Sequence, residues 1–220
     1  MSEPPPLRDP RASLPARRTV VVATTNRGKL RELRALLGAL PIDLVTPLDV
    51  LGRAIDVIED GATFEANAEK KALAVARATT LPTLADDSGL EVDALDGRPG
   101  VRSARFAGER ATDAENNRKL LHALEALGGD AARTARFRCA VVFVDPAVPQ
   151  AACQASGACE GAIAAVARGA GGFGYDPIFV VADAGGRTMA ELDDVEKNQR
   201  SHRARAVAEL LPSLRGWLAR

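Results

Sequence analysis

Apolar residues fall into regular patterns after a polar N-terminal stretch, and the earliest pattern predicts a strand followed by a helix. Residues 19–23 form a β-branched run that is short enough for a buried strand. Leucines then recur at helical spacing through residues 30–37, before Gly38 supplies a stop signal. The polar turn TTNRGK, residues 24–29, separates the two elements. The expected order is therefore strand, polar turn and helix.

Two further segments combine an apolar pattern with acidic residues. Apolar positions at helical spacing predict a second helix from Thr63 onward. Its expected buried residues are Phe64, Ala68, Ala72 and Val75. The run LPTLADD, residues 81–87, predicts a short strand that ends at Asp86 and Asp87, because turn-forming residues follow it. Side chains alternate along a strand, so at most one of these carboxylates can enter a given cleft.

The second half of the chain also mixes helix and strand signals. Residues 112–127 have a polar, helical pattern. Residues 135–145 and 151–163 are β-like runs with a short proline-containing link, which predicts an antiparallel pair. The glycine-rich residues 169–180 predict a tight turn before a strand, and Ser201 is the expected cap of a final helix. Together these elements predict an α/β fold.

Composition and charge narrow the possible functions. The chain has 29 Lys and Arg against 29 Asp and Glu, so no overall field favours nucleic acid or a membrane, and anion binding has to be local. No apolar run is long enough to span a bilayer. Residues 1–17 are proline-rich and charged, which predicts a disordered tail before one domain at 18–220, and they lack the apolar core of a signal peptide. The three cysteines lack CxxC spacing and are expected to be buried thiols in the cytoplasm.

The polar turn at residues 24–29 carries groups that bind phosphate. Thr24, Thr25, Asn26 and Lys29 bring hydroxyls, an amide and an ammonium to a helix start, where free N–H groups and the dipole favour an anion. An ordinary capped turn with a solvated lysine explains the same residues. A P-loop is excluded, because leucine follows the Gly-Lys pair.

Acidic residues suggest a metal site near the second helix. Four of them surround its predicted start: Glu59, Asp60, Glu65 and Glu69. Glu65 and Glu69 are like charges one helical turn apart, which is unfavourable unless a cation compensates. Lys70 and Lys71 could supply that charge, and a divalent cation is the sharper alternative.

Residues near the C-terminus suit a nucleobase. Phe173 and Tyr175 offer flat faces within the glycine-rich turn, and Asp176 offers a hydrogen-bond acceptor. Lys197 and Arg203 lie just before or within the final helix, where the dipole disfavours cations, so a bound anion would explain them. A tightly packed turn and a solvated basic face are the plainer explanations.

Acids for a metal, cations for phosphates and an aromatic turn for a base together describe a nucleotide site. Five segments carry a resemblance: TTNRGKLREL, GATFEANAEKKA, ADDSGLEVDALDGRPGVRSARFAG, GGFGYDPIFV and EKNQRSHRARA. In this order they resemble the inosine triphosphate pyrophosphatase family. The resemblance implies an elongated mixed β-sheet with flanking helices, forming two lobes around a central active-site cleft. It also implies a Mg²⁺-dependent homodimer that hydrolyses dITP, ITP and XTP to the monophosphate and pyrophosphate.

The resemblance assigns a role to each residue that matches a family motif. Asp87 would be the general base and would hold the metal together with Glu59, and Asp86 is a weaker metal candidate. The implied substrate-binding residues are Thr24, Thr25, Asn26, Lys29, Ser88, Phe173, Gly174, Tyr175, Asp176, Lys197, His202 and Arg203. A 6-oxo purine presents an acceptor where adenine presents an amine. Donors from His202, Arg203 and the glycine turn would therefore reject adenine.

Two other functions remain open from the sequence. A pyrophosphatase of other modified or ordinary nucleoside triphosphates would use the same residues. A nucleotide-binding sensor without catalysis is disfavoured, because a pure binder gains little from acids beside phosphates. Nucleic acid and membrane partners are not expected.

Overall fold

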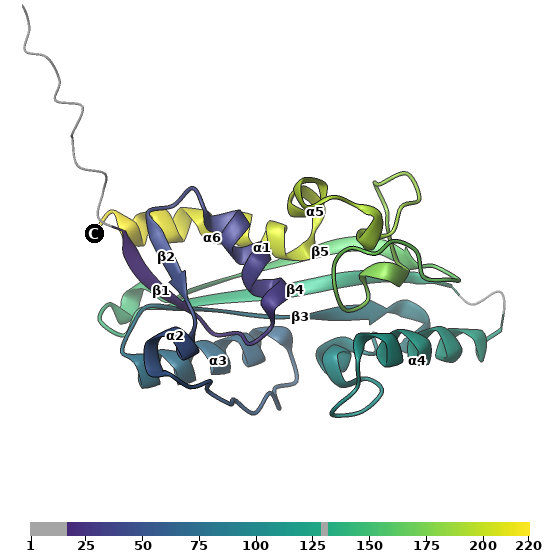
Figure 1. Cartoon of the computed structure of the whole chain (residues 1–220), viewed down its shortest axis with the longest axis horizontal. Coiled ribbons are helices and arrows are strands. Elements are labelled where there is room, and N and C mark those ends of the chain that lie inside the picture. The colour runs from purple at the N-terminus through teal and green to yellow at the C-terminus, as the bar shows by residue number, and fades with distance from the viewer. Residues whose placement is uncertain (1–16, 129–131) are drawn as a thin grey trace, which may run out of the picture.

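The described chain forms an elongated mixed α/β molecule (Figure 1). This computed structural model describes residues 17–128 and 132–220, so the predicted tail lies outside the described residues apart from residue 17. The strands are β1 (Arg18–Val22), β2 (Ile42–Val45), β3 (Thr83–Val92), β4 (Thr134–Val144), β5 (Cys153–Ile163) and β6 (Phe179–Val181). The helices are α1 (Arg27–Leu37), α2 (Pro47–Leu51), α3 (Phe64–Thr79), α4 (Asp113–Glu125), α5 (Asp194–Arg200) and α6 (His202–Leu218).

The described strands form one sheet in the order β2-β1-β3-β4-β5-β6. β1 runs parallel to β2 and β3, whereas β3, β4, β5 and β6 pair antiparallel in succession. The predicted antiparallel pair is therefore confirmed as β4 and β5. The mixed sheet with flanking helices confirms the expected fold class.

Local sequence signals set the starts of three helices, and two of these starts, at Thr63 and Ser201, were predicted. α1 begins after Asn26, α3 begins after Thr63, and α6 begins after Ser201, and each cap side chain accepts a backbone N–H from the first turn. All four apolar residues expected on the buried face of the second helix are buried in α3. No sequence signal predicts β2, α2 and α5, because elements of only 4, 5 and 7 residues have too little periodicity.

The strand expected to end at Asp86 and Asp87 is longer than predicted. β3 continues to Val92, because every residue from the two aspartates onward has a partner in β4. The Ser-Gly pair that indicated a turn lies inside this ladder. Both carboxylates therefore lie in mid-strand, near the centre of the sheet, and not at a strand end.

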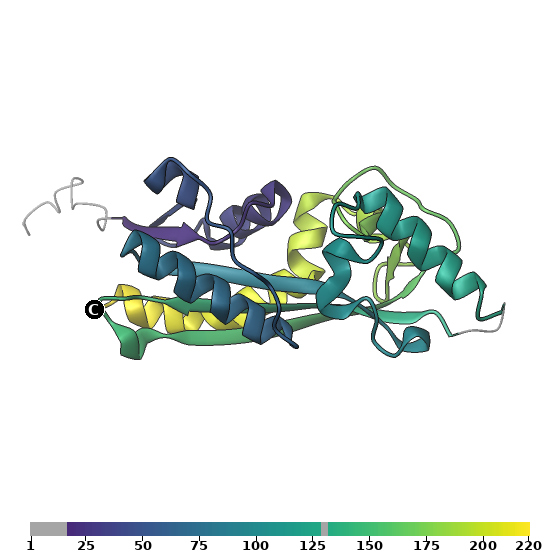
Figure 2. The same cartoon turned by 90° about the horizontal axis from the view of Figure 1, so that it is seen from below.

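Helices cover both faces of the sheet at the end that carries β1. Leu33 of α1 and Leu210 of α6 share a buried cluster with Leu84, whereas Val75 of α3 packs on the opposite face with Ala85. Leu84 and Ala85 are neighbours in β3, so the alternation of the strand divides the core into two layers. Figure 2 shows α4 and the C-terminal loops gathered around the other end of the long strands. Among the described residues, no helix is long and apolar enough to cross a membrane.

The cysteines only partly match the expectation of buried thiols. Cys139 and Cys159 are buried, but Cys153 is half-buried, and all three are free.

Candidate active site

A pocket of about 700 Å³ opens beside the middle of β3, where the two ends of the molecule meet. Its lining combines the turn before α1, the loop before α3, the glycine-rich turn before β6 and the start of α6. The residues to which the resemblance assigns catalysis, substrate binding or metal binding all lie in this lining, except the weaker metal candidate Asp86. The fold thus brings together residues that are far apart in the chain.

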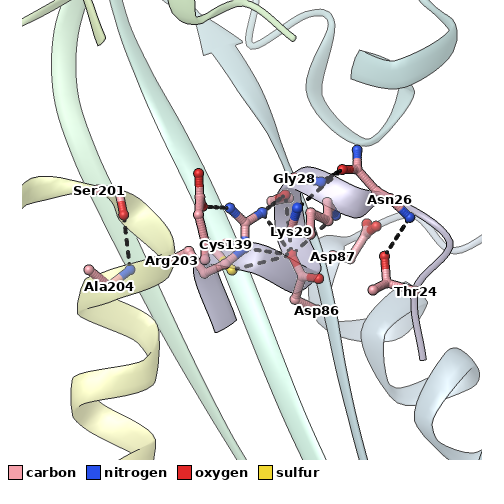
Figure 3. Close-up of polar contacts among 12 residues, drawn as sticks. Thr24, Asn26, Gly28, Lys29, Asp86, Asp87, Cys139, Ser201, Arg203 and Ala204 are labelled. Atoms are coloured by element: carbon pink, nitrogen blue, oxygen red, sulfur yellow. Dashed lines mark hydrogen bonds and ion pairs between the residues drawn. The ribbon is translucent and has the colours of Figure 1, made fainter. Parts of the chain in front are cut away.

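The turn before α1 is capped, yet its lysine is not solvated. The Asn26 Oδ1 atom accepts from the N–H groups of Gly28 (2.8 Å) and Lys29 (3.1 Å), so the cap already uses two donors expected for a phosphate. The Lys29 side chain is only 15% exposed, and its Nζ atom lies 3.1 Å from Asp86 Oδ2. Figure 3 shows these contacts beside Thr24. Lys29 therefore lines the pocket while its ammonium is paired with Asp86.

Asp86 and Asp87 have different partners, as the alternation of a strand predicts. Asp86 is buried, and its Oδ2 atom accepts from Nε (3.1 Å) and Nη2 (2.9 Å) of Arg203 (Figure 3). Burial opposes ionisation, but Lys29 and Arg203 outweigh it and hold the pKa of Asp86 well below its usual range. With two cations on it and no place in the pocket lining, Asp86 is a poor metal ligand.

Asp87 faces the pocket from the side of α3. Its Oδ1 atom accepts from Lys71 Nζ (2.8 Å), and its Oδ2 atom accepts from Asn67 Nδ2 (3.3 Å). Burial raises the pKa of Asp87 to about 6, although Lys71 and Lys29 oppose the shift. Glu59 accepts from the same Lys71 ammonium (3.0 Å), and Lys71 lowers the pKa of Glu59 against the effect of burial. One cation thus contacts both carboxylates.

Glu59 and Asp87 fit a magnesium ion. Mg²⁺ usually binds through one or two carboxylates and completes its coordination with substrate phosphates and water. Two acids that reach one ammonium and line an open pocket meet this requirement. No group of three or more His, Cys, Asp or Glu side chains that could hold a metal ion occurs in residues 17–128 and 132–220.

The lysines expected to compensate Glu65 and Glu69 pair elsewhere. Lys70 pairs with Asp60, and Lys71 pairs with Glu59 and Asp87. Of the two explanations for this acid pair, compensation by these lysines is therefore not what the fold uses, because the loop before α3 brings Glu59 and Asp60 to them.

The glycine-rich turn is fixed from α4. Gly174 has a positive φ of 62°; its N–H donates to Asp113 Oδ2 (2.7 Å), and its carbonyl accepts from Asn117 Nδ2 (3.1 Å). Lys197 Nζ lies 4.8 Å from the centre of the Phe173 ring. The turn therefore presents Phe173 to the pocket on a rigid support.

His202 and Arg203 line the same end of the pocket. His202 stacks on Phe137 with ring centres 4.8 Å apart, and burial together with the neighbouring cations lowers its pKa well below the usual value. Its imidazole is therefore neutral at pH 7, and its buried Nδ1 atom has no hydrogen-bond partner in the described chain. A ligand with a complementary polar edge would satisfy it.

Known proteins that resemble this chain identify its family. The family model described as the Ham1 family matches residues 20–213. The chain belongs to the Ham1 family. A dITP/XTP pyrophosphatase of Geobacter sulfurreducens is 52% identical over 198 residues, which cover 90% of this chain and 96% of that protein. One from Geobacillus kaustophilus is 50% identical over 87% of this chain and 91% of its own length. The structure of a HAM1 protein from Coxiella burnetii aligns with a TM-score of 0.80 at 44% identity, covering 90% of this chain and 98% of that one.

Two buried charges of this Ham1 protein escaped the sequence analysis as site residues. Lys71 contacts the candidate metal ligands, and Glu32 of α1 pairs with Lys197 (2.8 Å) and Arg203. Both lie on the buried faces of their helices. A charged residue at a position where the helical period expects an apolar one is the signal that could have found them.

Proposed function

We propose that this Ham1 protein hydrolyses non-standard purine nucleoside triphosphates, namely dITP, ITP and XTP, to the monophosphate and pyrophosphate. It would thereby remove deaminated purines from the nucleotide pool. One observation carries the proposal: a single pocket joins an acid pair and lysines to an aromatic turn with a neutral imidazole. The identity of about 50% to proteins named dITP/XTP pyrophosphatases supports the same activity.

The triphosphate would lie along the lysines of the pocket. Lys29, Lys71 and Lys197 line it, and each already faces a carboxylate. Ordered cations of this kind neutralise phosphate charge without first being organised by the substrate. The hydroxyls of Thr24 and Thr25 would donate to the phosphate oxygens.

Asp87 is the best placed general base. Its pKa of about 6 leaves it mostly ionised at neutral pH while still able to accept a proton. Lys71 and Asn67 hold one oxygen each, which orients the carboxylate toward the pocket. Mg²⁺ held by Glu59 and Asp87 would neutralise charge on the phosphates when bound.

The base end favours a 6-oxo purine. Phe173 would stack on the ring, and the neutral imidazole of His202 offers one donor and one acceptor to its polar edge. Adenine would leave a donor of the pocket facing its amine, and an unpaired buried donor is costly. The same cost explains how a site of this kind discriminates between bases of equal size.

Assembly and location complete the proposal. We expect a homodimer, to be tested by sedimentation equilibrium, with a monomer at micromolar concentration as the contradicting result. The cytoplasmic location stays a prediction, as does a single domain at residues 18–220.

A substrate panel tests the function. Pyrophosphate release from dITP, XTP, dATP and dGTP would be compared as kcat/KM, with and without Mg²⁺. A strong Mg²⁺-dependent preference for dITP and XTP is the expected result. Equal rates on all four would favour the broader pyrophosphatase, and binding without turnover would favour a sensor.

A further inference from the structure

An unbroken series of buried ion pairs runs behind the pocket. Lys29 pairs with Asp86 (3.1 Å), Asp86 with Arg203 (2.9 Å), and Arg203 with Glu32. Glu32 pairs with Lys197 (2.8 Å), which in turn pairs with Asp176 (2.6 Å) of the glycine-rich turn. The charges alternate from the candidate phosphate lysine to the candidate base turn. Figure 3 shows the first part of this series around Asp86.

The two inner acids do not line the pocket, although their cationic partners do. Asp86 and Glu32 therefore cannot touch a substrate without a large rearrangement. Isolated buried carboxylates are costly, so acids at these positions need a reason beyond filling space. Holding pocket cations in place is a function that fits their contacts.

A single oxygen atom of Asp86 makes the contacts that hold these cations. Its Oδ2 atom faces Lys29, Arg203 and the Ser88 hydroxyl (3.5 Å), whereas its buried Oδ1 atom has no hydrogen-bond partner in the described chain. Because Lys29 and Arg203 both contact this one oxygen atom, the position of one cation constrains the position of the other. The Oδ2 atom thus connects the part of the pocket proposed for the phosphates with the part proposed for the nucleobase.

The hydrogen bonds that Arg203 donates fix the orientation of its guanidinium group. Its guanidinium has five N–H groups. Nε donates to Asp86, Nη2 donates to Asp86 and Ser88, and Nη1 donates to Glu32. One N–H on Nη1 is left without a partner among the described residues, and its direction is set by the other four bonds.

We propose that Asp86 is a positioning residue that orders Lys29 for the phosphates and Arg203 for the base at the same time. The inference rests on the proposed function. Loss of the Asp86 charge should therefore displace both Lys29 and Arg203. Loss of the Glu32 charge should displace Arg203 but leave Lys29 in place.

Asp86→Asn is the main test. Pyrophosphate binding would be measured by calorimetry in the presence of Mg²⁺. We expect it to weaken by at least about tenfold, because Lys29 loses the charge-assisted hydrogen bond to Asp86 that holds it in position. The ratio of kcat/KM for dITP over dATP should also fall by at least about tenfold. Glu32→Gln should lower this ratio too, but change pyrophosphate affinity less, because Lys197 keeps Asp176.

Asp145→Asn is the matched control for losing a buried carboxylate. Asp145 is 3% exposed, accepts from Trp217 Nε1 (2.7 Å) and lies outside the pocket lining. It should lower the Tm while leaving both readouts within about twofold of wild type. If Asp145→Asn shifts both readouts as much as Asp86→Asn, the inference is overturned, because general destabilisation would then explain the effect of Asp86→Asn.

The remaining outcomes separate the inference from the proposed function. If the wild type discriminates dITP from dATP and folded Asp86→Asn keeps both readouts, the inference fails alone. If the wild type hydrolyses no triphosphate, the proposed function fails. Should Asp86→Asn not fold, Asp86→Glu decides: it keeps the charge but displaces the carboxylate, so pyrophosphate binding should weaken by about threefold or more, and unchanged binding overturns the inference.

Discussion

Gly157 of β5 lies directly beneath the start of α6, and its replacement by alanine tests how the fold positions the site. A Cβ atom at this position would lie 2.3 Å from the carbonyl oxygen of His202 and 2.4 Å from the backbone nitrogen of Ala206. Ordinary C···O contacts begin at about 3.3 Å, so α6 would have to move by about 1 Å. Backbone atoms cannot rotate away as a side chain can.

The structural cost translates into two measurable losses. Overpacking of this kind costs about 1–3 kcal/mol. For a chain of this size each kcal/mol lowers the Tm by about 2–4 °C, so Gly157→Ala should melt about 2–12 °C lower. His202 and Arg203 open α6, and a misplacement of about 1 Å can cost about 100-fold in rate. We therefore expect kcat/KM for dITP to fall by about that factor.

Gly216→Ala is the matched control. Gly216 lies in the same helix, and a Cβ there would meet no atom within 4 Å. Alanine is better than glycine in a helix by about 0.5–1 kcal/mol, so this variant should melt slightly higher and keep full activity. Calorimetry and pyrophosphate release would be measured on both. If Gly157→Ala keeps the wild-type Tm and kcat/KM, the contact does not set the position of α6 and the reasoning is refuted.

Four further predictions concern the chemistry. Asp87→Asn should lower kcat by about 10²–10⁴ while triphosphate binding stays measurable by calorimetry, and retained turnover would exclude Asp87 as the base. Phe173→Ala should raise KM for dITP by about 5- to 150-fold through lost stacking, and an unchanged KM would contradict a stacking role. Because the pKa of Asp87 is raised to about 6, its ionised form dominates above that pH; kcat/KM should therefore fall about tenfold per pH unit below it, and a flat profile from pH 5 to 7 would contradict this. Chelation of Mg²⁺ should abolish turnover, and its return should restore it; activity in excess chelator would exclude the metal role of Glu59 and Asp87.

Local signals explain which parts of the fold could be predicted. The caps at Asn26, Thr63 and Ser201 each act within three residues, so the sequence alone contains the interaction. The long runs of β4 and β5 were equally readable. The residues of the candidate site could be predicted from their types and from the order of the motifs, because neither requires the distances between them in the folded protein.

The partners of the buried charges could not be predicted in the same way. Glu32 and Arg203 are 171 positions apart, and only the packing of α1 against α6 makes them neighbours. The sequence offers Lys71 acids on its own helix, whereas the fold gives it Asp87 from β3. Charge pairing over such separations depends on tertiary structure, and a sequence pattern indicates only that a charge will be buried.

The error at the end of β3 follows from a second kind of long-range effect. Gly89 looked like part of a turn, but a Cβ there would lie 2.4 Å from Ser103 Oγ and 2.5 Å from the Gly100 carbonyl. The glycine therefore marks a close approach between β3 and the segment that follows it, and Gly157 marks the approach of α6 to β5 in the same way. A glycine flanked by residues that pair on both sides is better explained by a neighbouring element than by a turn. Ser103 and His202, which approach Gly89 and Gly157, both line the pocket, so these two glycines lie beside the site.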